Sequence, residues 1–201
     1  YNISCYGTDA YRVRAEAHNT YVINPDQSPG QLRDKLGNYS VKRRSDESVY
    51  MSIEDLTSSY TPWVNRARRG YKLTDSFRSL TVRDEIEMKE RSDFYWFWTT
   101  GAEITLEERS AILTIDGVRM RFAFVSNQPL SLSVMDCIPL ESSPIPEPNQ
   151  DSQGNADNTG YKKLVLRGSV NGQLQLEVKL SPILDGAEDF MPENLPFALW
   201  D

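Results

Sequence analysis

Residues 111–125 read Ala-Ile-Leu-Thr-Ile-Asp-Gly-Val-Arg-Met-Arg-Phe-Ala-Phe-Val, and this stretch decides the fold. Apolar side chains recur at every second position on both sides of Asp116-Gly117, which is the spacing of a half-buried β-strand. Asp and Gly both tolerate positive φ angles, so the pair is a signal for a tight turn. The stretch therefore predicts two antiparallel strands joined by a two-residue hairpin.

Short segments of the same kind occur on both sides of this hairpin, about ten residues apart, and no amphipathic helix of about ten residues or more interrupts them. Predicted strands cover residues 48–55, 71–74, 79–88, 94–99, 103–107, 130–134, 163–167 and 173–180, with one or two more in 11–24. This pattern is typical of an all-β protein, an antiparallel β-sandwich of two packed sheets with about 10–14 strands. One long polar loop is expected near residues 141–160.

Length and charge limit the domain organisation and the partners that the chain can have. The 201 residues are 39% hydrophobic, which suits a single β-sandwich domain over residues 1–201. The longest apolar run, Phe94–Trp98, is far shorter than the roughly 20 residues that span a bilayer, so we expect no membrane span. The formal net charge is −7. An acidic protein is a poor general binder of phosphate backbones, so we expect no nucleic-acid partner.

The histidine count restricts catalysis. His18 is the only histidine in the chain, so any Ser-His or Cys-His nucleophile pair would have to use it. The sequence contains no glycine-rich phosphate loop, no nucleophile elbow and no pair of carboxylates at a diagnostic spacing. We therefore assign no catalytic residue. His18, expected within a strand, is either one ligand of a metal ion or a partly buried, hydrogen-bonded histidine.

Aromatic and basic runs each allow two interpretations. Phe94–Trp98 is either core or a platform for sugar rings, and core is favoured because alternate residues point to opposite faces of a strand. Arg66–Arg69, with residues 42–44, is either a solvated loop or a binding site for a polyanion, and the loop is favoured. Residues 84–87 are expected at an exposed strand edge.

The C-terminal segment and the two cysteines also allow predictions. The Pro-rich tail after Ser181 is expected to lie extended, with its aromatic side chains tucked into a sheet edge. Cys5 and Cys137 lie far apart in the sequence and show no metal-binding spacing, so they are expected to be buried thiols, although a pair between them stays open.

Four segments in order resemble a known family: Arg14–Asn24, Ser79–Ile86, Tyr95–Thr100 and Ala111–Gly117. They are similar to the C-terminal β-domain of heparinase II/III-like polysaccharide lyases, over roughly residues 11–185. The sharpest piece is His18-Asn19-Thr20 followed by an apolar strand.

The resemblance implies a two-part enzyme that cleaves uronate-containing polysaccharides, such as glycosaminoglycans, by β-elimination. In such enzymes an α/α toroid precedes the β-sandwich and supplies most of the catalytic groups. This chain would then be a C-terminal fragment whose toroid is absent. We expect it to be inactive alone, and whether to call it an enzyme stays open.

The resemblance also implies a metal ion and a cellular location. His18 matches one ligand of a zinc site whose other ligands, a His-x-His pair and an aspartate, would precede Tyr1. Zinc is therefore expected in the full-length parent and not tightly bound in this chain. The expected partners are an acidic polysaccharide and the missing α/α domain, and the expected location is periplasmic or secreted. No substrate-binding residue is identified. The alternative is a non-catalytic carbohydrate-binding or structural sandwich.

Overall fold

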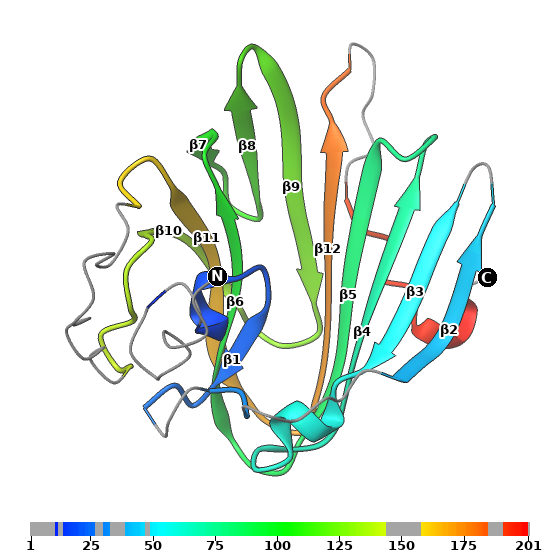
Figure 1. Ribbon diagram of the computed structural model, residues 1–201, viewed down its shortest axis with the longest axis vertical. Helices are drawn as coiled ribbons and strands as arrows, with labels where there is room; N and C mark the ends of the chain where they lie inside the picture. Colours follow the sequence, from blue (N-terminus) through cyan, green and yellow to red (C-terminus); the bar gives the residue numbers. More distant parts are fainter. Residues whose placement is uncertain are drawn as a thin grey trace, which may run out of the picture.

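The computed structural model describes residues 11, 14–26, 30–32, 39–46, 49–143, 158–184 and 191–200. These residues form an antiparallel β-sandwich of a four-stranded and an eight-stranded sheet, which confirms the predicted fold class (Figure 1). Its twelve strands fall within the expected number. No helix in these residues is long and apolar enough to cross a membrane.

The smaller sheet has the order β1-β6-β11-β10. Its strands are β1 (Tyr21–Ile23), β6 (Ser92–Thr100), β11 (Lys162–Val170) and β10 (Ser131–Asp136). The central pair, β6 and β11, is in register over nine residues, from Lys162 opposite Thr100 to Val170 opposite Ser92.

The larger sheet has the order β2-β3-β4-β5-β12-β9-β8-β7. Its strands are β2 (Tyr39–Ser45), β3 (Tyr50–Asp55), β4 (Val64–Thr74), β5 (Ser79–Met88), β12 (Gln173–Pro182), β9 (Val118–Ser126), β8 (Ser110–Ile115) and β7 (Glu103–Leu106). The predicted hairpin is β8–β9. Asp116 and Gly117 have φ angles of 51° and 78°, the positive values that the two-residue turn requires. Short 3-10 helices cover Ala15–Ala17 (η3), Thr57–Tyr60 (η4) and Phe197–Leu199 (η5).

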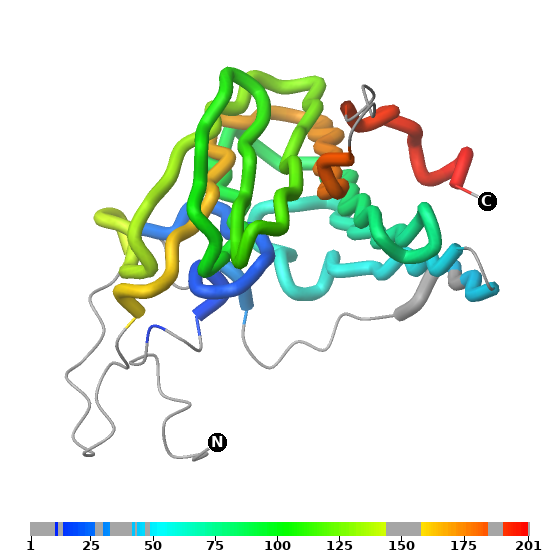
Figure 2. The backbone as a smooth tube through the Cα atoms, turned by 90° about the horizontal axis from the view of Figure 1, so that it is seen from above, coloured from blue at the N-terminus to red at the C-terminus, as the bar shows by residue number. Residues whose placement is uncertain are grey.

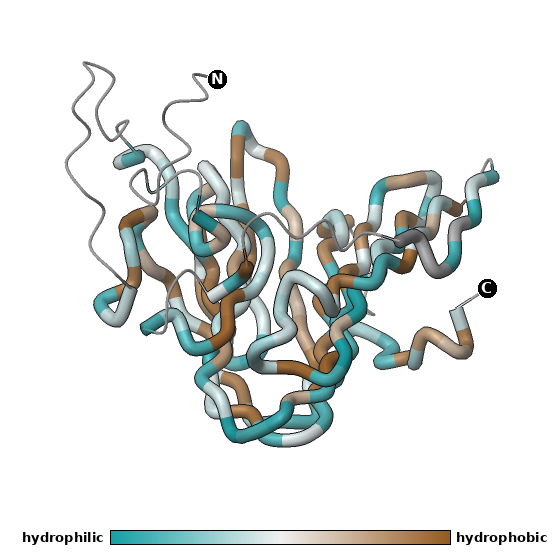
Figure 3. Tube along the Cα trace, turned by 60° about the horizontal axis from the view of Figure 1, so that its bottom comes forward, coloured by the Kyte–Doolittle hydropathy of each residue, from teal (hydrophilic) through white to brown (hydrophobic). Residues whose placement is uncertain are grey.

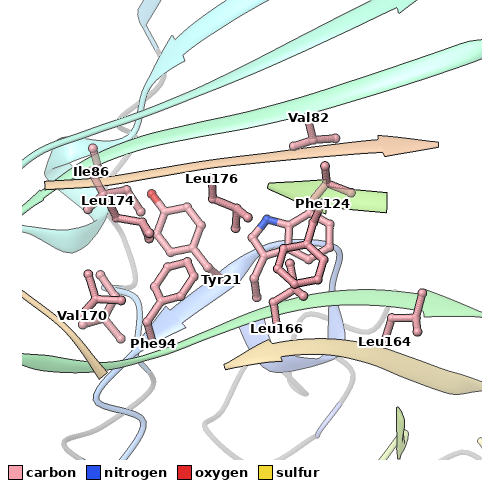
Figure 4. Packing of buried hydrophobic residues seen from close by; sticks show 14 of the residues in the cluster. Tyr21, Val82, Ile86, Phe94, Phe124, Leu164, Leu166, Val170, Leu174 and Leu176 are labelled. Atoms are coloured by element: carbon pink, nitrogen blue, oxygen red, sulfur yellow. The ribbon is translucent and has the colours of Figure 1, made fainter. Parts of the chain in front are cut away.

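The main core lies between the two sheets, because alternate residues of each strand point inward (Figure 4). Figure 3 shows hydrophobic and hydrophilic residues following one another along the chain. Phe94 and Trp96 of β6 belong to it and are almost fully buried. Phe97 points the other way and packs in a second cluster on the outer side of the smaller sheet, with Ala15, Val22, Leu140 and Val165. Burial on both faces confirms the assignment of the aromatic run to the core.

The C-terminal segment 191–200 lies on the outer face of the larger sheet, far from β10 and β11 (Figure 2). Phe197 and Trp200 pack there against Met51 and Ile53 of β3. The backbone N–H of Phe197 donates to Glu85 of β5, 2.9 Å away. The tail therefore covers a sheet face, and the expectation that its aromatic side chains fill a sheet edge is wrong.

Two polar runs are placed differently from the prediction. Residues 66–69 belong to β4, not to a loop, and residues 84–87 belong to β5, which is an interior strand and not an edge. Both strands tolerate charge because the charges pair across them, as between Arg68 and Glu85 at 2.9 Å. Polarity was a misleading sign of exposure here. Cys5 and most of the polar loop predicted near 141–160 lie outside the described residues.

Candidate functional site

His18 lies at a corner between η3 and β1, not within a strand as expected. Its backbone N–H donates to the carbonyl of Ala15 at 3.0 Å, and its carbonyl accepts from the N–H of Thr20 at 2.8 Å. These two bonds turn the chain sharply enough to leave the side chain exposed. The interpretation of His18 as a partly buried histidine is therefore wrong, and its ring faces solvent.

Asn19 anchors this corner to both sheets. Its side-chain oxygen accepts from the N–H of Thr99 in β6 at 2.8 Å. Its backbone carbonyl accepts from Nη1 of Arg69 in β4 at 3.0 Å. The carbonyl of Thr20 accepts from the N–H of Phe97 at 2.9 Å. The residues beside His18 thus hold a solvent-facing imidazole on a fixed backbone.

Behind the corner lies a buried ion pair between Arg69 and Asp84. Nε and Nη2 of Arg69 each lie 2.7 Å from one of the two carboxylate oxygens of Asp84, a bidentate geometry. Nε1 of Trp96 donates to the same carboxylate at 2.9 Å. The guanidinium also lies over the ring of Tyr21, 4.9 Å from its centroid. Residues from β1, β4, β5 and β6 therefore meet at one polar centre inside the sandwich.

The surroundings of this centre shift the pKa values of Arg69, Tyr21 and Tyr60. Burial by itself would lower the pKa of Arg69, but the ion pair and hydrogen bonds with Asp84 raise it above its usual value. Burial also raises the pKa of Tyr21 and of Tyr60, which keeps both phenols neutral. A guanidinium with a raised pKa and two phenols with raised pKa values suit the centre to holding structure and not to proton transfer.

The described residues do not by themselves make a metal site. No three His, Cys, Asp or Glu side chains in that part of the chain lie close enough together to share an ion. Glu16, the acidic residue nearest to His18 in the sequence, already accepts from the N–H of Leu140 and the hydroxyl of Ser143, both at 2.9 Å. His18 as a zinc ligand stays a prediction.

A second titratable cluster lies on the outer side of the smaller sheet, and no motif in the sequence predicts it. Lys163 of β11 is fully buried, and its Nζ donates to the carbonyl of Ile138 at 3.0 Å. The same ammonium lies 4.8 Å from the ring centroid of Phe97 and 5.2 Å from that of Tyr11. Burial lowers the pKa of Lys163 and raises the pKa of Cys137 and of Tyr11.

An open pocket of about 400 Å³ adjoins this cluster. Its lining residues come from the end of β10, the turn before β11 and the N-terminal segment: Tyr11, Asp136, Cys137, Ile138, Pro139, Asn158, Thr159, Tyr161 and Lys162. Three segments far apart in the sequence form it. Periodicity, which acts within one strand, therefore carries no signal for it.

The basic run does not form a continuous surface. Arg69 faces the core, whereas Arg68 points to the outer face and pairs with Glu85. Lys42 donates to the carbonyl of Trp200, and Arg44 pairs with Asp46. The side chain of Arg43 lies outside the described residues. Because most of these cations are already paired, this arrangement does not favour the polyanion-binding interpretation.

Comparison with known proteins adds evidence on the fold. No protein-family model matches the chain, and no curated protein matches it. Its fold is similar to the crystal structure of a heparinase III, with a TM-score of 0.58 and 10% identity over 83% of this chain and 23% of that one. A heparan sulfate lyase from Pedobacter heparinus gives a TM-score of 0.62 and 10% identity, over 87% of this chain and 26% of that one. The chain has a heparinase-like fold.

The chain spans about a quarter of each of these structures, which are much larger. Its resemblance to the lyases, first noted from the His18 corner and the strands around it, thus extends to the tertiary structure at the level of the fold.

Proposed function

We propose that this chain is the β-sandwich part of a heparinase-like polysaccharide lyase. The parent would act on an acidic, uronate-containing polysaccharide by β-elimination. The observation that carries the proposal is the match of most of the chain to about a quarter of solved heparinase structures, one of which is a heparan sulfate lyase. On this proposal the chain is the C-terminal domain, and an α/α toroid precedes it.

The proposal gives the sandwich a supporting role in the reaction. A base must remove a proton from the uronate, and polar groups must neutralise the uronate carboxylate. Among the described residues, no three His, Cys, Asp or Glu side chains lie together as a group that could hold a metal ion. We therefore assign the reaction chemistry to the toroid and the rigid wall of the cleft to the sandwich. The location that goes with an extracellular polymer is the periplasm or the medium.

His18 is the residue through which the sandwich would contribute a metal ligand. Its imidazole is exposed and stands on the backbone that Asn19 fixes, so it is available to ligands outside the described residues. A His-x-His pair and an aspartate ahead of Tyr1 would complete a zinc site. On its own the chain is expected to lose zinc on dialysis. Stoichiometric zinc that is retained by the chain and lost in His18→Ala would contradict this expectation.

The lyase proposal is tested with the parent and with the chain alone. Heparin, heparan sulfate and alginate are incubated with each protein, and the 4,5-unsaturated uronate product is followed by its absorbance. We expect product from the full-length parent, none from the isolated chain, and none from a parent that ends before Tyr1. Product from the isolated chain, or undiminished product from the shortened parent, would contradict the proposal.

The alternative function is a non-catalytic carbohydrate-binding module. The open pocket beside Tyr161 is the observation that favours it. Affinity electrophoresis in gels containing acidic polysaccharide separates the two functions. Strong retardation of the isolated chain favours a binding module, and no retardation favours one half of a cleft.

A further inference from the structure

One edge of the sandwich is open to pairing with a further strand. β10 is the outer strand of the smaller sheet and pairs with β11 alone, in unbroken register over all six of its residues (Figure 1). In the part of the chain that the structure describes, no backbone hydrogen bond joins residues 131–136 to a turn or loop. Alternate N–H and C=O groups of β10 therefore point outward, where another strand can bond to them.

The other three sheet edges have features that normally prevent such pairing. β1 has three residues, all buried, and the N–H of Ile23 donates to the carbonyl of Gly30 at 3.1 Å. β2 is rich in Lys and Arg, and its register shifts between Ser40 and Lys42. β7 has only four residues and begins with Glu103. Short length, cover, irregular register and charge are the usual protections of edge strands.

β10 has none of these protections. Its sequence, Ser131-Leu-Ser-Val-Met-Asp136, contains no Pro, Lys or Arg, and its register is unbroken. The one charged residue, Asp136, is the last of the strand and already pairs with Lys162 of β11. Leu132 and Val134 lie on the face that joins the main core, and Val134 remains 36% exposed there. A regular edge strand with apolar side chains is a template for one more strand.

The side chains of β10 suit a second copy of the same strand. Opposed residues of antiparallel strands point to the same face, so a two-fold axis between two copies must pass at a single residue. With the axis at Ser133, the two copies of Ser133 face each other, and Leu132 lies opposite Val134 of the second copy. Asp136 then lies opposite Leu130, so no two carboxylates meet. Hydroxyl pairs are favourable across strands, whereas like charges directly opposite each other are not.

We propose that two copies of this chain associate through β10, antiparallel about a two-fold axis at Ser133. Their two four-stranded sheets would then form one continuous sheet. Pairing of β10 with a different edge of the second copy would meet the protections of that edge and leave another β10 open for a third copy. Self-pairing closes on itself and ends at a dimer. The proposal does not rest on the lyase function.

Dimerisation is tested by sedimentation equilibrium of the whole chain. Because one pair of six-residue strands is small for an interface, we expect a weak dimer, with a dissociation constant on the order of 100 μM. Between about a tenth of this concentration and about ten times it, the average mass should rise from that of one chain toward that of two, and no further.

Val134→Lys should weaken the association at least about tenfold, because it places an ammonium on an apolar face against Leu132 of the second copy. Val118→Lys is the matched control. It makes the same substitution at a residue that is 61% exposed beside the β8–β9 turn, and it should dimerise as the unchanged chain does. Far-UV circular dichroism checks that both variants are folded.

Cross-linking tests the position of the axis. In a chain with Cys5→Ser and Cys137→Ser, Ser133→Cys should give a disulfide-linked dimer under mild oxidation, because opposed residues at the axis bring their Cβ atoms close together. Thr105→Cys, at an exposed residue of the β7 edge, is the control and should cross-link much more slowly.

Several results would overturn the proposal. These are a monomer throughout the concentration range, a mass that grows beyond two chains, and association that is as strong in folded Val134→Lys as in Val118→Lys. Cross-linking of Ser133→Cys that is no faster than that of Thr105→Cys would also overturn it. The outcome of the lyase assay has no bearing on these measurements.

Discussion

At the scale of single residues, the most consequential interaction is the buried pair of Arg69 and Asp84. Both side chains are at most 2% exposed, and the carboxylate also accepts a bond from Trp96. Two charges of this kind add little net stability while paired, but removing one leaves the other uncompensated in the interior. The pair also links the carbonyl of Asn19 to the larger sheet, so its loss would loosen the His18 corner.

Asp84→Asn is therefore expected to destabilise the fold strongly. The amide cannot neutralise the guanidinium of Arg69, and breaking a buried pair in this way costs about 3–5 kcal/mol. The free energy of unfolding is measured by urea denaturation. The m-value, the slope of this free energy against urea concentration, should be the same for the variant and the parent protein.

The control for this variant is Asp136→Asn, because Asp136 pairs with Lys162 at an exposed site. An exposed ion pair contributes about 0–1 kcal/mol, so this variant should remain close to the parent protein in stability. Equal losses in the two variants would show that the buried pair has no special role.

At the scale of elements, the C-terminal segment is fitted closely to the sheet beneath it. Gly70 of β4 pairs with Ile53 and Arg83 and lies under the ring of Phe197. A Cβ atom at this position would lie 2.4 Å from the ring of Phe197 and 2.8 Å from that of Trp200. Glycine is needed here for close approach and not for a special backbone angle.

Gly70→Ala is expected to displace the segment from the sheet. The overlap should cost about 1–3 kcal/mol of stability, the usual range for overpacking. Because Trp200 would move, tryptophan fluorescence should change and proteases should cut the C-terminal segment faster.

Gly160→Ala is the matched control for this substitution. A Cβ atom there meets nothing within 4 Å, and a surface change of this kind stays within about 0.5 kcal/mol. Unchanged proteolysis of Gly70→Ala would mean that the segment does not depend on this contact.

Strand prediction succeeded where one face of the strand is apolar and failed where charges pair across the sheet. The segments 79–88, 111–115 and 173–180 show clear alternation and form β5, β8 and β12. The segments 39–45 and 64–70 are rich in Lys and Arg, and they too form strands. Their partners, such as Glu85 for Arg68, are supplied by neighbouring strands, which no local pattern reveals.

At the scale of the whole molecule, one continuous core joins the two sheets. It combines Tyr21, Phe94 and Leu166 of the smaller sheet with Val82 and Leu176 of the larger one (Figure 4). The inner face of each sheet is largely apolar, and each sheet shields the inner face of the other from water.

The two sheets are therefore expected to unfold together. Far-UV circular dichroism, which reports on strands, and tryptophan fluorescence, which reports largely on the core at Trp63, Trp96 and Trp98, should give the same urea midpoint. Two separated transitions would mean that part of the sandwich unfolds independently.

The sequence by itself determined the fold class, the β8–β9 hairpin and the assignment of the aromatic run to the core. These follow from the period-2 alternation of strands and from turn chemistry, both of which act between near neighbours in the chain. It also singled out the His18 corner, where a resemblance to lyases was strongest. Only the tertiary structure decided that Arg69 and Asp84 are buried together, that Asn19 ties the corner to both sheets, and that Tyr11, Cys137 and Tyr161 line one pocket. The physical reason is that such contacts depend on the order and register of strands that lie far apart in the sequence, which alternation within one strand does not specify.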